Sequence, residues 1–247
     1  VLDGEAFARG RLGFQPDPVQ ASLLRPRHKQ LILNCTRQWG KSTVAAAKVV
    51  HHAWSHPESL ALIVCPSERQ GGEFLKKAAA FLRRLGIPRR GDGLNRVSLA
   101  LPNESRIVAV PAKDATVRGF SDVTLMIVDE AAQVPDQHYE AMTPMLGPRD
   151  GDLWLISTPW VKAGFFWEAW SNEDPEWTRI SVKATECPRL SAAFLAKERK
   201  RKGEAQFRRE FLCEFFDAEA SLFGREELFR LMHPSVRALW APEGFMR

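Results

Sequence analysis

A lysine and two hydroxyl side chains follow a short apolar run near the start of the chain, in an order typical of phosphate binding. The apolar run covers 31–33. The segment after it reads Asn34, Cys35, Thr36, Arg37, Gln38, Trp39, Gly40, Lys41, Ser42 and Thr43. An Ala-rich stretch, 43–50, comes next and is predicted to be helical. A strand, a loop and a helix in this order place backbone N–H groups and a helix N-terminus around phosphates.

This segment matches the Walker A pattern except at the first glycine of that pattern, where Cys35 stands. In the motif the lysine, here Lys41, binds the terminal phosphates, and the next hydroxyl, here Ser42, binds Mg²⁺. Residues 36–43 are therefore expected to bind a nucleoside triphosphate. The alternative is a chance occurrence of Gly, Lys and Ser after an apolar run, and a second motif argues against it.

The second motif is a β-rich apolar run, 124–128, that ends in Asp129 and Glu130. A strand here places both carboxylates at its C-terminal end, beside the phosphate loop. In such sheets the first acid holds Mg²⁺, and a second acid can polarise the attacking water. We therefore expect Asp129 to bind the metal and Glu130 to be catalytic. The alternative is a solvated strand end.

Strand-like runs alternate with helical stretches along most of the chain. These runs are 31–34, 60–65, 97–101, 105–110, 123–129, 152–157 and 178–184. Residues 97–110 are predicted to form a hairpin. The order predicts an α/β fold of the P-loop NTPase (RecA/ASCE-like) type, a mainly parallel sheet flanked by helices with an added β-hairpin. The nucleotide is expected at the carboxyl ends of the strands.

These motifs together resemble the N-terminal ATPase domain of large terminase subunits, the motors that package DNA into the procapsids of tailed bacteriophages. Terminases commonly lack the first Walker A glycine and carry an Arg-Gln pair in the loop, as Arg37 and Gln38 stand here. Their Walker B strand runs into Asp-Glu-Ala-Ala, as at 129–132. Their coupling motif, Ser-Thr-Pro after a strand, is matched by Ser157 and Thr158 with the proline that follows.

Two further segments carry the resemblance, which covers roughly 14–220. Residues 17–20 look like the segment whose glutamine reads adenine, and this assigns that role to Gln20. Residues 207–220 are similar to the segment that closes the terminase ATPase domain. Residues 1–220 are therefore expected to be the ATPase domain, with 1–30 as an N-terminal extension and 221–247 as a linker or tail.

The resemblance implies ATP hydrolysis that drives double-stranded DNA into a procapsid, with ATP and Mg²⁺ as cofactors. It also implies a homo-oligomeric ring on a portal, a small terminase subunit as partner, and the host cell cytoplasm as location. Terminases have an arginine before a glycine upstream of Walker B, regarded as a finger that reaches the neighbouring subunit. Arg118 takes that role by resemblance, while Arg37 is the candidate for a finger acting in cis.

Full-length large terminases continue into an RNase H-like nuclease domain. Such a domain needs on the order of 100 residues or more, and the stretch after 220 is shorter. Nuclease activity is therefore not expected from this chain. Two other interpretations stay open, a fragment of a superfamily 2 helicase-like DNA translocase and a nucleotide-gated scaffold that does not hydrolyse ATP.

The basic residues are unevenly distributed, although 35 Lys and Arg against 30 Asp and Glu give a net charge of only +5. Four of them cluster in and after a helix expected to begin near Glu73, and they are candidates for contacts with DNA phosphates. They are Arg83, Arg84, Arg89 and Arg90. A solvated helix end is the alternative. A second basic run, 197–202, is interpreted as the solvated face of a helix capped by Ser191.

The remaining features indicate one packed domain. The four cysteines lack metal-ligand spacing and are interpreted as reduced packing residues. No apolar run is long enough to span a membrane. Helix-spaced aromatic residues after the coupling motif are interpreted as core. They are Trp160, Phe165, Phe166, Trp167 and Trp170.

Overall fold

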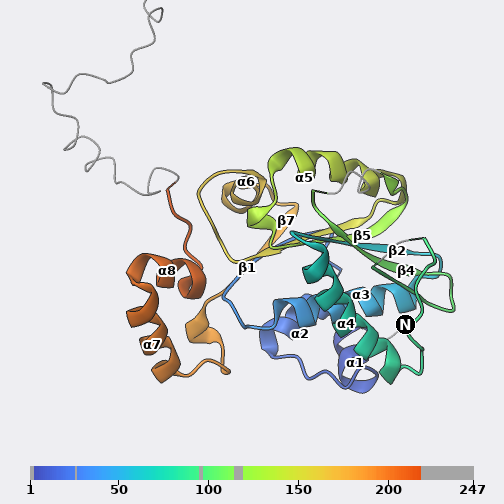
Figure 1. Ribbon diagram of the computed structural model, residues 1–247, viewed down its shortest axis with the longest axis horizontal. Coiled ribbons are helices and arrows are strands. Elements are labelled where there is room, and N and C mark those ends of the chain that lie inside the picture. Colours follow the sequence, from blue (N-terminus) through green and yellow to red (C-terminus); the bar gives the residue numbers. More distant parts are fainter. Residues whose placement is uncertain (1–2, 26, 95–96, 114–118, 218–247) are drawn as a thin grey trace, which may run out of the picture.

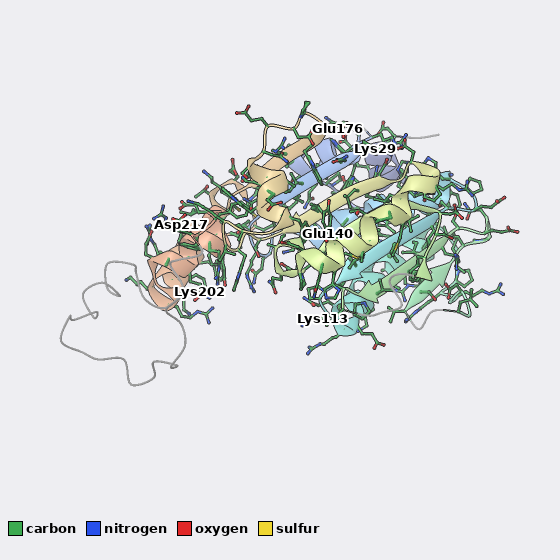
Figure 2. All side chains as sticks on the ribbon, turned by 90° about the horizontal axis from the view of Figure 1, so that it is seen from above. Lys29, Lys113, Glu140, Glu176, Lys202 and Asp217 are labelled. Carbon is green, nitrogen blue, oxygen red and sulfur yellow. The ribbon has the colours of Figure 1, made fainter. Side chains whose placement is uncertain are left out.

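The computed structural model describes residues 3–25, 27–94, 97–113 and 119–217. In this part of the chain a central sheet lies between two layers of helices, and two further helices lie beside the sheet (Figure 1). Lys202 and Asp217 mark this lateral part in Figure 2, whereas Lys113 and Glu140 belong to the main body. None of the helices within the described ranges has the length and apolar character that crossing a membrane requires.

The sheet has seven strands in the order β3-β4-β2-β5-β6-β1-β7. The strands are β1 (Gln30–Cys35), β2 (Leu60–Cys65), β3 (Ser98–Ala100), β4 (Arg106–Pro111), β5 (Val123–Asp129), β6 (Asp152–Ser157) and β7 (Trp177–Val182). Every pairing is parallel except that of β3 with β4, which is antiparallel. The predicted α/β fold and its added hairpin are confirmed.

Helices cover both faces of this sheet. On one face lie α1 (Gly4–Gly10), α2 (Pro18–Leu24), α3 (Lys41–Ser55) and α4 (Glu68–Arg84), and on the other α5 (Asp136–Met142) and α6 (Phe165–Ser171) (Figure 1). The lateral helices are α7 (Ala192–Lys202) and α8 (Glu204–Leu212). Short 3₁₀ turns are η2 (Ala131–Gln133), η3 (Thr143–Arg149) and η4 (Ala184–Glu186).

Strand β1 shows how the sequence builds two cores from one sheet. Successive side chains of a strand point to opposite faces. Leu31 and Leu33 accordingly join the cluster under α1–α4, and Ile32 joins the cluster under α5 and α6. All three are essentially inaccessible to solvent. Parallel strands covered on both faces read as continuous apolar runs, which is why the sequence located them well.

Helix boundaries differ more from the prediction than strands do. Helix α4 begins at Glu68, not near Glu73, and Ser67 caps it by accepting a hydrogen bond from the backbone N–H of Gln70. The Gly71-Gly72 pair conceals this first turn in the sequence. Gly71 is required by close packing, because a Cβ there would lie 3.1 Å from the Cβ of Ala109. Helix α3 also extends beyond the predicted 43–50 at both ends.

Candidate functional site

The sheet order brings three predicted motifs to one edge. Strands β5, β6 and β1 are neighbours, and all three run in the same direction. Their carboxyl ends are Asp129, Ser157 and Cys35. The predicted phosphate loop, Walker B carboxylates and coupling motif therefore lie side by side, at the edge where ligands of parallel α/β sheets bind.

The phosphate loop ends at a helix N-terminus that no side chain caps. Gly40 precedes α3 with φ of 99°, a backbone conformation that favours glycine. Gln38 also has a positive φ, 63°, so the loop turns back on itself before the helix begins. A helix N-terminus without a side-chain cap leaves N–H donors for an anionic ligand.

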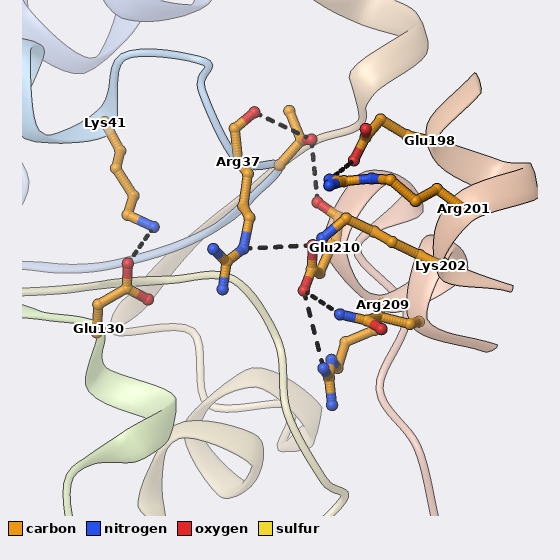
Figure 3. Close-up of polar contacts among 10 residues, drawn as sticks. Arg37, Lys41, Glu130, Glu198, Arg201, Lys202, Arg209 and Glu210 are labelled. Atoms are coloured by element: carbon orange, nitrogen blue, oxygen red, sulfur yellow. Dashed lines mark hydrogen bonds and ion pairs between the residues drawn. The ribbon is translucent and has the colours of Figure 1, made fainter. Parts of the chain in front are cut away.

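An ion pair joins the two predicted catalytic groups. The Lys41 Nζ lies 2.7 Å from the Glu130 Oε1, and the two side chains are only 13% and 20% exposed (Figure 3). The other carboxylate oxygen of Glu130, Oε2, is buried and has no hydrogen-bond partner within the described part of the chain. Burial opposes the charge of Lys41, but the nearby carboxylates of Glu130 and Asp129 outweigh it and raise the Lys41 pKa.

Asp129 is buried beside this pair. Desolvation raises the pKa of its carboxyl to about 6, and the charge of Lys41 opposes that rise. Its Oδ1 accepts a hydrogen bond from the backbone N–H of Glu130, with N and O 3.1 Å apart. A buried carboxylate with so little compensation is a favourable place for a cation.

The coupling residues connect two of the three strand ends. The Ser157 hydroxyl donates to the carbonyl of Thr158 and accepts a hydrogen bond from the backbone N–H of Ala132, at 2.7 and 3.3 Å. Ala132 lies in η2, directly after Glu130. One side chain therefore ties the end of β6 to the turn that holds the predicted catalytic carboxylate.

Gln20 supports the loop backbone. Its side-chain amide nitrogen donates to the carbonyl of Trp39 at 3.1 Å, and its amide oxygen accepts from the backbone N–H of Asp17. The residue is fully buried. Arg189 donates to the same Trp39 carbonyl and lies 3.3 Å from Asp17. No motif marks Arg189 in the sequence, and adenine reading by Gln20 stays a prediction.

Glu210 of α8 is the second residue that sequence reasoning left out of the site. Its backbone carbonyl accepts hydrogen bonds from the N–H of Arg37 at 3.2 Å and the hydroxyl of Thr36 at 3.1 Å. Its carboxylate lies 3.5 Å from Arg37 and 2.6 Å from Lys202, and it accepts a hydrogen bond from Gln206 (Figure 3). The phosphate loop is thus attached to α8 through both backbone and side chain.

The charge of Glu210 is well compensated despite its position. Burial opposes ionisation, but the hydrogen bonds from Gln206 and Lys202 and the charge of Arg37 outweigh it and lower the Glu210 pKa. Arg209 is a third cation near this carboxylate, at 3.9 Å. The carboxylate therefore holds Arg37 through electrostatic attraction when no nucleotide competes for it.

The interpretation of the basic run 197–202 as solvated is wrong for part of it. Glu198 is buried and lies 2.7 Å from Arg201. Lys202 is half-buried because it reaches Glu210. The predicted cap is confirmed, since the Ser191 hydroxyl accepts from the N–H of Phe194. The run therefore helps to join α7 to α8.

The predicted DNA-contacting cluster divides in two. Arg84 donates to the carbonyl of Leu12, so it has a structural contact within the domain. Arg83, Arg89 and Arg90 are exposed. Arg118, the predicted trans finger, lies outside the described residues, as does the predicted tail at 221–247.

The aromatic residues after the coupling motif are not all core. Phe165 and Phe166 are buried as predicted, but Trp160 is 43% exposed, and the Arg209 guanidinium lies 4.1 Å from its ring centroid. The chain returns to this segment after α8, because Phe216 donates to the carbonyl of Trp160 and accepts from the N–H of Lys162. All four cysteines are buried free thiols, as predicted.

A mainly parallel sheet with a glycine-lysine loop after one strand and paired carboxylates after a nearby strand defines a P-loop NTPase of the ASCE class. The family described as the N-terminal region of the T4-like-virus-type terminase large subunit matches residues 32–230. The chain belongs to this family.

Curated relatives and solved structures agree. The terminase large subunit of Thermus phage G20c is 28% identical over 168 residues, which are 60% of this chain and 34% of that protein. The chain therefore spans about a third of the length of the curated relatives it matches.

Solved terminase structures share the fold. The large terminase ATPase domain of Thermus phage P74-26 aligns with a TM-score of 0.73 at 21% identity, covering 87% of this chain and all of that one. The HK97 bacteriophage large terminase aligns with 0.71 at 19%, covering 86% and 55%. The large terminase of another thermophilic bacteriophage, solved in complex with ADP, aligns with 0.66 at 12%, covering 87% and 54%.

Proposed function

We propose that this domain hydrolyses ATP to move double-stranded DNA into a viral procapsid. The observation that carries the proposal is the Lys41–Glu130 pair at an uncapped helix N-terminus, with Asp129 buried beside it. Family membership supplies the context of DNA packaging. A scaffold that does not hydrolyse ATP is less well supported, because the carboxylate expected to be catalytic is present and close to the phosphate loop.

The residues present fit ATP and Mg²⁺. The uncapped N-terminus of α3 offers donors to phosphates, the Glu130 Oε2 lacks a partner among the described residues, and burial leaves Asp129 in need of positive charge. Ser42 and Asp129 would hold the metal, and the residues 36–43 would hold the phosphates. The metal supplies positive charge that stabilises the transferring phosphoryl group.

The pairing of Lys41 with Glu130 implies a change when nucleotide binds. Phosphate oxygens compete for the Lys41 ammonium, since a charge-assisted hydrogen bond to phosphate replaces the one to carboxylate. Glu130 then loses its cation and can accept a proton from the attacking water. The same competition applies to Arg37, which leaves Glu210 if it acts in cis on the γ-phosphate.

The hydrogen bond from Ala132 to Ser157 offers a route from chemistry to movement. A shift of the turn after Glu130 changes the end of β6, and from there the segment that contacts Arg209 and Phe216. We assign Ser157 and Thr158 the coupling role on this basis. Gln20 keeps its proposed place on the adenine side of the loop.

The wider assembly follows from the family. The domain is proposed to work in the host cell cytoplasm as a homo-oligomeric ring on a portal, with a small terminase subunit as partner. Arg118 is proposed to act in trans on a neighbouring subunit's nucleotide. Among the basic candidates, the exposed Arg83, Arg89 and Arg90 are better placed to contact DNA phosphates than Arg84, which is engaged with Leu12.

Steady-state ATPase assays, with and without duplex DNA and procapsids, test the proposal. Glu130→Gln should retain nucleotide binding and lower the hydrolysis rate by about 10²- to 10⁴-fold, because it keeps the volume and removes the base. Glu140→Gln on α5 is the matched control, since that carboxylate is exposed on the main body (Figure 2). Wild-type turnover by Glu130→Gln would refute the catalytic assignment.

A further inference from the structure

A second cavity lies at the opposite edge of the sheet from the phosphate loop. It has a volume of about 580 Å³ and lies at the amino ends of the strands, where Ser59, Thr124 and Asp152 line it. The second half of α3 forms another wall, through Lys48 and Ser55 among others. The phosphate loop is at the beginning of the same helix. Helix α3 therefore passes from one site to the other.

Lys48 is a buried cation without an ionic partner. Its residue surface is only 6% exposed, and it makes no hydrogen bond or ion pair within the described ranges. Its ammonium lies 5.3 Å from the centroid of the Trp154 ring. The face of an aromatic ring compensates a buried charge only in part. Burial accordingly lowers the Lys48 pKa, against the attraction of the Asp152 carboxylate.

A second polar group at this cavity also lacks a partner. The Ser55 Oγ is buried and has no hydrogen bond to the described residues. Ser55 lies seven positions after Lys48, two turns further along α3 and on the same face. A hydroxyl and an ammonium both donate hydrogen bonds, so an acceptor is the group that would satisfy the two together.

The carboxylates at the cavity are already engaged and do not fill this need. Asp152 lies 2.8 Å from Arg27, and Asp150 lies 2.6 Å from Lys29. Asp3 accepts the capping hydrogen bond of α1 from Ala6. Glu58 is exposed at the rim, where solvent screens its charge.

We propose that this cavity binds a small phosphate-class oxyanion, with Lys48 and Ser55 as its inner donors and Arg25 and Arg149 at its rim. Both arginines line the cavity and their side chains are largely exposed, so each can turn toward a ligand. Duplex DNA does not qualify as the ligand, because a cation this deeply buried is out of reach of a double-helix backbone. The source is either free phosphate or the phosphoryl group of a nucleotide.

The test uses Lys41→Ala protein, so that the phosphate loop is disabled and its failure cannot be mistaken for failure of this site. Thermal unfolding is followed with increasing orthophosphate, pyrophosphate or ADP, at constant ionic strength set with NaCl. A ligand that binds only the folded state raises the unfolding temperature. The orthophosphate and pyrophosphate arms report free anion, and stabilisation by ADP alone assigns the site to a nucleotide.

The double variant Lys41→Ala/Lys48→Met should lose this stabilisation, with apparent affinity at least ~10-fold weaker, since it removes the inner charge. Lys41→Ala/Lys76→Met is the matched control, because Lys76 is exposed on α4, and it should behave as the parent. If Lys48→Met does not fold, Ser55→Ala should weaken the affinity several-fold. No stabilisation of the parent by any of the three ligands, or equal affinity in the parent and the folded Lys48 or Ser55 variant, overturns the proposal.

Discussion

Two lysines of helix α3 are buried at opposite edges of the sheet, and their electrostatic surroundings differ. Lys41 lies 2.7 Å from Glu130 with Asp129 nearby, and its pKa is raised. Lys48 has an aromatic ring for a neighbour and no ion pair among the described residues, and its pKa is lowered. Burial acts against the charged form in both cases. The carboxylates, not the degree of burial, decide which lysine holds its proton more firmly.

The largest expected effect is the loss of nucleotide binding when the paired lysine is removed. Lys41→Ala should weaken ATP affinity by roughly 10- to 100-fold, since it deletes a charge-assisted contact to the phosphates. Titration calorimetry with a slowly hydrolysed ATP analogue measures this. Lys76→Ala is an exposed control. Unchanged affinity in Lys41→Ala would show that the loop does not bind phosphate as assigned.

The next effect concerns the carboxylate beside that pair. The Asp129 pKa is about 6 in the folded chain against an ordinary 3.8, so the folded state binds a proton that the unfolded state releases between these values. Its contribution therefore makes the fold less stable as pH rises from about 4 to 6. Asp129→Asn removes it and should add about 1–3 kcal/mol to the free energy of unfolding at pH 8, without nucleotide.

Urea unfolding of wild type and Asp129→Asn at pH 4 and pH 8 provides the measurement. The difference between the two proteins should be small at pH 4, where the carboxyl is largely protonated in the folded state. It should reach its full size at pH 8. An asparagine variant that is less stable than wild type at pH 8 contradicts the role of burial in raising this pKa.

The smallest effect compares the two lysines as structural groups. Lys41→Met leaves Glu130 buried without its cation and should lower the free energy of unfolding by about 1–3 kcal/mol at pH 7. Lys48→Met removes an uncompensated charge and keeps the apolar stem, so its effect should be neutral or stabilising by up to ~1 kcal/mol. Both are measured by urea unfolding without ligand. A larger loss in Lys48→Met than in Lys41→Met would reverse the comparison.

The sequence predicted those parts of the site in which chemistry and local structure occupy one continuous segment. Lys41 and Ser42 sit at the start of a helix after an apolar strand, and Asp129 and Glu130 end another such strand. Apolar runs fix the strands, and parallel strands bring their ends together. The order of motifs was therefore sufficient to predict the sheet edge.

Residues that support the loop from a distance were not predicted. Glu210 and Arg189 contact the phosphate loop across 174 and 150 positions of sequence, and nothing in their own segments indicates it. Their positions depend on how α8 and the chain before α7 return to the sheet, which is a property of packing. The inward direction of Glu198 and Lys202 was missed for the same reason, because a highly charged helix gives little periodic signal.

The contact of Phe216 with the segment after the coupling motif has a mechanical consequence. The backbone hydrogen bonds to Trp160 and Lys162 are 3.1 and 2.6 Å long, and a Lys162–Asp217 ion pair of 2.9 Å lies beside them. A tensile load applied to the chain at Asp217 is therefore shared between α8 and the continuation of β6. Traction from that end would pull on the strand whose tip Ser157 ties to the turn after Glu130.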